Sequence, residues 1–201
     1  NQVEIIQATF SNISLSGIGN GITVNALLQT GSLLLINDSE FILCKGSNIY
    51  GGAINLNISF EGQVIISNST FNQCEAQYGG GIYLSIESGG NLTIDGQCSF
   101  TECKSSDYGG GIWAQISGVN SLLTLEDGLK FENCESDGQG EGGGIYFEIY
   151  GQATSIINKV QFSYCNASSG GGVYLYGRNQ VKQIFDGTKF TNCEAYYDGG
   201  G

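Results

Sequence analysis

The sequence predicts an all-β protein, a right-handed parallel β-helix of about seven coils with about 30 residues in each. Three observations predict it: a phenylalanine that recurs at a nearly constant interval, a cysteine three residues after it, and a run of glycines followed by a strand-like alternation. A period of this size indicates a solenoid, in which each repeat stacks on its neighbour. We expect one such domain over residues 1–201, cut within a coil at both ends.

The phenylalanine of the F-x-x-C motif sets the period. Its seven copies are separated by 31, 30, 29, 31, 31 and 28 residues: Phe10, Phe41, Phe71, Phe100, Phe131, Phe162 and Phe190. A cysteine follows six of them at the third residue: Cys44, Cys74, Cys103, Cys134, Cys165 and Cys193. In a stack of coils each column becomes a ladder along the axis, and we expect both ladders inside.

Glycines follow each cysteine, and a strand follows the glycines. Gly79–Gly81, for example, precede a segment in which Ile82 and Leu84 alternate with polar residues, as in a strand with one buried face. A second apolar segment precedes each phenylalanine and a third contains it, so we expect three strands and three turns in each coil. The glycines supply corner conformations that a Cβ would forbid and allow close backbone approach.

These motifs resemble the repeats of the chlamydial polymorphic outer-membrane proteins, whose paired motifs are G-G-A-[ILV] and F-x-x-N, and those of related protist surface β-helix proteins. Gly51-Gly52-Ala53-Ile54 matches the first motif outright, and the pattern covers essentially the whole chain. The departure is cysteine where that family has asparagine. The resemblance implies a surface-exposed, adhesive β-helix, and it bears on architecture more than on partner, because repeat motifs specify a fold rather than a ligand.

The six cysteines of the column are expected to stack as a core ladder. Neighbouring coils lie about 4.8 Å apart, a Cα separation that disulfides tolerate. In-register strands also hold their Cβ atoms about 4.8 Å apart, whereas a disulfide needs about 3.8 Å, so we favour thiols, with disulfides as the alternative. Cys98 falls in another core column, as a small apolar residue. A metal site is disfavoured, because the thiols lie along a line and the chain has no histidine.

Six Asn-x-Ser/Thr sequons are candidate acceptors of N-linked glycan: Asn12, Asn37, Asn57, Asn68, Asn91 and Asn166. The strand alternation places Asn57, Asn68 and Asn91 at outward positions and the other three at turns. None falls in a core column. The sequons favour a eukaryotic secreted protein, and the alternative is chance triplets in an Asn-rich bacterial repeat.

An aromatic row is expected on the outer face of the strand that follows the glycines. Its members are Tyr83, Trp113, Tyr146 and Tyr174. At about 4.8 Å spacing these rings stack on one another, and stacking alone explains the row. The functional interpretation is a flat, exposed strip that binds sugar rings or a partner protein, with Glu148 on its acidic edge.

Charge excludes several classes of partner. The chain has 19 acidic and 7 basic residues, a net charge of −12, which opposes binding to nucleic acid and to anionic membranes. No apolar run approaches the roughly 20 residues of a membrane span, so we expect no membrane insertion in this segment. Together with the sequons, this favours an extracellular or cell-surface location.

Catalysis is also disfavoured. Cleavage of acidic polysaccharides, an activity of many β-helices, needs clustered carboxylates or basic residues against the substrate. The chain has a single arginine, Arg178, and the adjacent Glu126 and Asp127 diverge in an extended chain. A calcium site in the loop 135–141 lacks the regular oxygen spacing of a dedicated loop. We therefore predict no catalytic residues, no cofactor and no metal.

The sequence favours a secreted or cell-surface structural or adhesive module, with a glycan-binding module that uses the aromatic row as the alternative. Residues 1–6 align with the second strand of a repeat, and 199–201 stop where earlier copies continue into a strand. We therefore expect further coils of the same chain or another subunit to continue the ladders as an end-to-end fibre, because an open solenoid end exposes unpaired backbone groups. The alternative is an ordinary cap just outside these residues.

Overall fold

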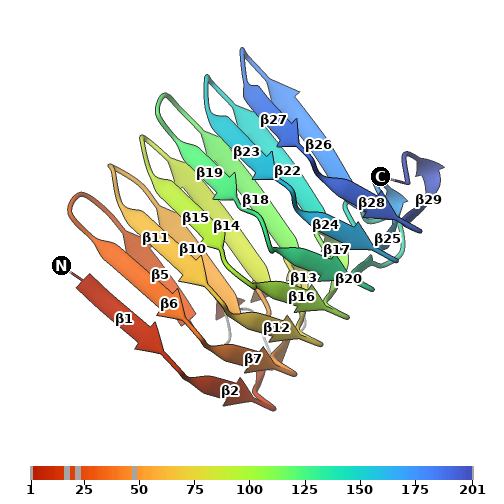
Figure 1. The fold of residues 1–201 in the computed structure, drawn as a ribbon, viewed down its shortest axis with the longest axis horizontal. Coiled ribbons are helices and arrows are strands. Elements are labelled where there is room, and N and C mark those ends of the chain that lie inside the picture. Colours follow the sequence, from red (N-terminus) through yellow and green to blue (C-terminus); the bar gives the residue numbers. More distant parts are fainter. Residues whose placement is uncertain (1, 16–18, 21–23, 47–48, 201) are drawn as a thin grey trace.

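The expected solenoid is confirmed. The computed structural model describes residues 2–15, 19–20, 24–46 and 49–200, and these form parallel β-strands without a helix. The strands stack in about six full turns, from β1 at the N-terminal end to β29 at the C-terminal end (Figure 1). Within the described part of the chain there is accordingly no helix long and apolar enough to cross a membrane.

Two ladders surround the phenylalanine. The pre-Phe ladder consists of β1 (Gln2–Ile6), β6 (Leu33–Asn37), β11 (Gln63–Ser67), β15 (Asn91–Asp95), β19 (Leu122–Leu125), β23 (Thr154–Asn158) and β27 (Lys182–Asp186). The Phe ladder consists of β2 (Thr9–Ser11), β7 (Glu40–Ile42), β12 (Thr70–Asn72), β16 (Ser99–Thr101), β20 (Lys130–Glu132), β24 (Gln161–Ser163) and β28 (Lys189–Thr191). Both keep one register through the stack, because each inward residue sits on its equivalent in the next coil.

Two further ladders flank the glycines. The post-Gly ladder consists of β5 (Val24–Leu28), β10 (Ile54–Ile58), β14 (Ile82–Glu87), β18 (Ile112–Ser117), β22 (Ile145–Tyr150) and β26 (Val173–Arg178). The post-Cys ladder consists of β3 (Ser14–Leu15), β8 (Lys45–Gly46), β13 (Glu75–Tyr78), β17 (Lys104–Tyr108), β21 (Glu135–Ser136), β25 (Asn166–Ser169) and β29 (Glu194–Asp198). The short strands β4 (Gly19–Asn20) and β9 (Ile49–Tyr50) extend the post-Cys ladder at one edge.

The fourth ladder corrects the sequence prediction of three strands in each coil. The post-Cys strands are short, and β13 buries one small side chain, Ala76, among polar residues. Such a strand carries no apolar alternation, which is the pattern that reveals a half-buried strand in a sequence. Its pairing with β17 comes from the backbone, through the register of Glu75 on Lys104 and Ala76 on Ser105.

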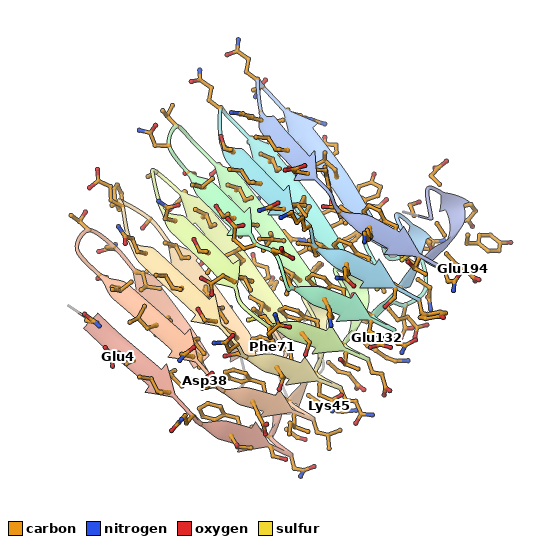
Figure 2. All side chains as sticks on the ribbon, viewed as in Figure 1. Glu4, Asp38, Lys45, Phe71, Glu132 and Glu194 are labelled. Carbon is orange, nitrogen blue, oxygen red and sulfur yellow. The ribbon has the colours of Figure 1, made fainter. Side chains whose placement is uncertain are left out.

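The phenylalanine and cysteine columns line the interior. Phe71 stacks on Phe41 at 4.9 Å between ring centroids and on Phe100 at 4.5 Å, and Phe71 lies within the stack in Figure 2. Phe131 is fully buried, as expected. The phenylalanine column is less completely buried at the C-terminal coil, where Phe190 is 39% exposed. The phenylalanine and cysteine columns therefore belong to the core of the protein, and each coil buries the inner side chains of its neighbours.

Two corners of each coil have left-handed backbone conformations, which restrict the type of residue that can stand there. In every coil the residue before the cysteine column has φ between 52° and 55°: Asn12, Leu43, Gln73, Glu102, Asn133, Tyr164 and Asn192. At the other corner the first glycine of each triplet is also left-handed, for example Gly109 with φ 70°. A Cβ at the second glycine, Gly110, would overlap the carbonyl oxygen of Gly143 in the next coil. Both functions expected of the glycines are thus present.

Candidate functional site

The four residues of the aromatic row do stack along the post-Gly ladder. Tyr83 and Trp113 lie 4.4 Å apart at an angle of 5° between ring planes. Trp113 and Tyr146 are 6.4 Å apart at 9°, and Tyr146 and Tyr174 are 5.4 Å apart at 2°. The in-register strands β14, β18, β22 and β26 hold these rings nearly parallel. This part of the prediction is confirmed.

The exposure expected for this row is wrong for its middle members. Trp113 is only 8% exposed and Tyr146 only 7%, whereas Tyr83 and Tyr174 are half-buried. A second column of tyrosines, at the ends of β9, β13 and β17, covers the row. Tyr78 meets Trp113 edge-on at 6.4 Å, and the ring of Tyr108 lies 4.9 Å from that of Tyr146.

The glycine corner explains this packing. It turns the chain so that the last residue of a post-Cys strand lies against the first outward residue of the post-Gly strand one coil further on, as Tyr50 lies against Tyr83. The sequence contained a signal for it, because Tyr50, Tyr78 and Tyr108 each directly precede a glycine triplet or its equivalent. Burial raises the pKa of Tyr83 to about 12, and it also raises the pKa of Tyr146, where the nearby Glu148 carboxylate adds to the effect.

Glu148 organises the acidic edge of the row. Its Oε1 accepts a hydrogen bond from the Tyr146 hydroxyl at 3.2 Å, and its Oε2 accepts bonds at 3.1 Å from the Tyr150 hydroxyl and from Gln115 Nε2. In the next coil Tyr176 continues the Glu148 column, and the Arg178 guanidinium lies 4.8 Å from the centre of the Tyr176 ring. The more accessible polar and aromatic groups of this face therefore lie on β22 and β26.

A second candidate surface, on the outer face of the post-Cys ladder, was missed by the sequence analysis. Lys45 Nζ lies 2.5 Å from Glu75 Oε1, and Lys104 Nζ lies 2.7 Å from Glu135 Oε2. We call these four residues, which follow the cysteine column directly, the charge ladder. They border a shallow groove of about 400 Å³ on this face. Lys45 is labelled at the flank of the stack in Figure 2. The pattern becomes visible when the residue after each cysteine is aligned.

The sequon asparagines are accessible. Asn12, Asn68 and Asn166 are exposed, and the remaining three are half-buried. Asn68 lies at a left-handed corner with φ 48° between β11 and β12, where its Oδ1 accepts a hydrogen bond from the backbone of Gln97 at 3.1 Å. Asn57 lies on the outer face of β10, and Asn91 begins β15. The outward positions agree with the prediction, and attachment of glycan remains a prediction.

The cysteines are free thiols, and those of the column from Cys44 to Cys165 are fully buried. Four thiols of the column bridge coils: Cys44, Cys74, Cys103 and Cys134. The Sγ of Cys134, for example, donates to the carbonyl oxygen of Phe100 in the preceding coil at 3.4 Å. Burial and the neighbouring thiols of Cys103 and Cys165 raise the pKa of Cys134, and burial raises that of Cys98 to about 11. Cys134 thus satisfies a backbone acceptor at the corner as a neutral thiol.

The loop between β21 and β22 holds the acidic residues weighed as a calcium site. Burial and the nearby Glu135 raise the pKa of the Asp137 carboxyl, and burial raises that of Glu141. A raised carboxyl pKa means that the local surroundings disfavour negative charge. Among the residues that the structure describes, no three histidine, cysteine, aspartate or glutamate side chains gather around one point to hold a metal ion.

Comparison with known proteins adds no relative. No family model matches the chain, no curated protein matches it, and no solved structure matches it.

Proposed function

We propose that this protein is a non-catalytic structural and adhesive module of a cell surface or of extracellular material. The observation that supports it most is the continuity of the four ladders, which pair every coil with the next from β1 to β29. A stack of this kind is a stiff, quasi-one-dimensional body whose outer side chains can vary without disturbing the core. It suits a spacer or stalk that presents its flanks to partners, including further coils or other copies.

The proposed location is supported by the six sequons, all of which are exposed or half-buried. In an oxidising compartment accessible thiols form disulfides. The column from Cys44 to Cys165 is fully buried, so an external oxidant reaches these thiols only after local opening. Reduced cysteines are therefore compatible with a secreted protein of this fold.

Antibodies against the protein test this proposal on intact cells of the source organism. Labelling before permeabilisation is the expected result, together with a mass decrease of the native protein after treatment with a glycan-removing enzyme. Labelling that requires permeabilisation, with no mass change in any sequon peptide, would contradict the extracellular role.

A second candidate function, binding of a neutral glycan, is favoured by the Glu148 cluster. Sugars are recognised by aromatic faces for their C–H groups and by polar side chains for their hydroxyls, and the outer face of β22 and β26 combines Tyr176 and Arg178 with a carboxylate held by two tyrosines. The pair Arg178 and Tyr176 is partly accessible, unlike Trp113.

A glycan array tests the second candidate with matched variants. Glu148→Ala and Tyr176→Ala should each lose binding to any glycan that the native protein retains. Tyr164→Ala serves as the control, because this 53% exposed tyrosine lies on another part of the surface. Equal loss in the control, or no glycan bound by the native protein, would count against this candidate.

A further inference from the structure

The charge ladder alternates in sign from coil to coil. The register sets Glu75 beside Lys45 on one side and beside Lys104 on the other, and Glu135 follows Lys104. Two lysines and two glutamates give the column no net charge, in a chain whose net charge is −12. Their side chains are 30% to 44% exposed, so they are available on the surface. This column therefore repels the same column of a second copy less than a wholly acidic column does.

From this pattern we propose that the post-Cys face binds a second copy of the same chain, with the two solenoid axes antiparallel. Reversing the order Lys, Glu, Lys, Glu gives its charge complement. A two-fold axis between the coils of Glu75 and Lys104 therefore sets Lys45 opposite Glu135 of the second copy and Glu75 opposite Lys104. Such an interface is isologous, since every contact occurs twice and the assembly closes as a dimer.

The columns on either side obey the same symmetry. Gln73 and Glu102 occupy equivalent places in the two central coils, and within one chain Gln73 Nε2 donates to Glu102 Oε2 at 2.7 Å. Gln77 Nε2 likewise donates to Asp107 Oδ2 at 2.9 Å. The two-fold operation sets each of these amides opposite the equivalent carboxylate of the second copy. Donors and acceptors therefore match across all three columns in the two central coils.

The spacing of the charges favours a second copy of the chain over an extended peptide or a helix as the partner. Successive coils rise by about 4.8 Å, whereas same-face residues of an extended peptide are about 6.6 Å apart and a helix rises about 5.4 Å in each turn. A peptide or helix with alternating charges falls out of register with the ladder within two or three steps. Another stack of coils with the same rise keeps every lysine opposite a glutamate.

The four strands of the charge ladder, β8, β13, β17 and β21, carry no sequon, and Asn12 and Asn166 lie one coil beyond either end. The two-fold operation sets the coil of Asn12 opposite the coil of Asn166 of the second copy, so glycan at either asparagine would hinder the dimer. The dimer is therefore expected of protein without glycan at these two positions. Exposed ion pairs are individually weak, and four coils extend only about 19 Å. The association is therefore a weak one that salt disrupts, and it belongs with small, transient interfaces.

A charge-swap experiment tests the arrangement in purified protein by sedimentation equilibrium. The quadruple variant Lys45→Glu, Glu75→Lys, Lys104→Glu, Glu135→Lys keeps the alternation and should dimerise as the native chain does at about 50 mM salt. A mixture of the two, with one fluorescently labelled, should form no mixed dimers, because the antiparallel arrangement then sets like charges opposite each other. Raising the salt to about 500 mM should dissociate both homodimers.

A single substitution measures how much the charge ladder contributes to the dissociation constant of the dimer. Lys104→Glu sets two glutamates against each other twice in the dimer, and we expect the dissociation constant to rise about tenfold or more. Lys130→Glu is the matched control, because it makes the same charge change at an exposed site on the Phe ladder and should leave the constant within about twofold. Circular dichroism confirms that each variant is folded.

Two results would overturn the inference. Mixed dimers that form in preference to either homodimer would indicate a parallel, in-register arrangement. A native protein that stays monomeric at about 1 mM in low salt would remove the interface altogether. The inference goes beyond the proposed cell-surface role, because it concerns purified protein and holds or fails wherever the protein is located.

Discussion

The inner and outer columns of this solenoid follow opposite rules. Inside, the same residue recurs: Phe100, Phe131 and Phe162 stack at 4.8 Å with ring planes within 9°. Outside, the column next to the cysteines changes sign at every step from Lys45 to Glu135. Identical apolar rings gain from stacking, whereas identical charges at the coil spacing repel. The core therefore fixes the repeat, and the surface can be different in every coil.

The largest effect is expected from a charge in the inner column. Phe131→Asp buries an unpaired carboxylate where the ring is fully covered, and we expect a loss of more than about 4 kcal/mol in the free energy of unfolding. Urea unfolding followed by circular dichroism measures it. Lys130→Asp, at the outward neighbour, should change stability by less than about 1 kcal/mol. Comparable losses in the two variants would show that the inner and outer columns are not energetically distinct.

The glycine corner should be the next most sensitive. An added Cβ in Gly110→Ala would overlap backbone oxygens of Gly143 and Glu135, and we expect a loss of about 2 to 4 kcal/mol. In Gly138→Ala the added methyl meets no neighbour, so only the cost of a left-handed alanine at φ 68°, about 1 kcal/mol, remains. Thermal unfolding of the two variants separates close backbone approach from conformational strain, and an equal cost would disprove the packing argument.

Alkaline pH should destabilise the folded protein through the buried thiol of Cys98. Burial raises the Cys98 pKa from 9.0 to about 11, so the folded state favours the protonated thiol. The stabilisation is present below pH 9 and is lost as pH rises towards 11, by up to about 2 kcal/mol. Urea unfolding at pH 8 and pH 10.5 should show a smaller loss of stability in Cys98→Ala than in the native chain. The same loss in both proteins would rule out a contribution from this thiol.

The smallest expected effect is an increase in stability, from a substitution at an outward corner. Tyr164 has φ 54°, a conformation that asparagine tolerates better than tyrosine, and Asn133 already stands at the equivalent position of the previous coil. Tyr164→Asn should raise the free energy of unfolding by about 0.5 to 1 kcal/mol, because the ring is 53% exposed and contributes little packing. The reverse change, Asn133→Tyr, should lower it. Opposite signs would indicate that the ring of Tyr164 stabilises its coil.

The sequence by itself determined the period, the inner columns and the role of the glycine triplets. In a solenoid each residue contacts its equivalent in the next coil, so an alignment of repeats is already a contact map. This is why the stack from Phe41 to Phe162, the buried thiols beside it and the corner at Gly109–Gly111 could be predicted from one chain.

Only the tertiary structure decided how different ladders meet. The fourth ladder, with strands as polar as β13, and the cover that Tyr78 places over Trp113 depend on the angle through which each corner turns the chain. An alignment of repeats contains the contacts along the axis but none across a corner. For that reason it predicted the stacking of Trp113 and not its burial.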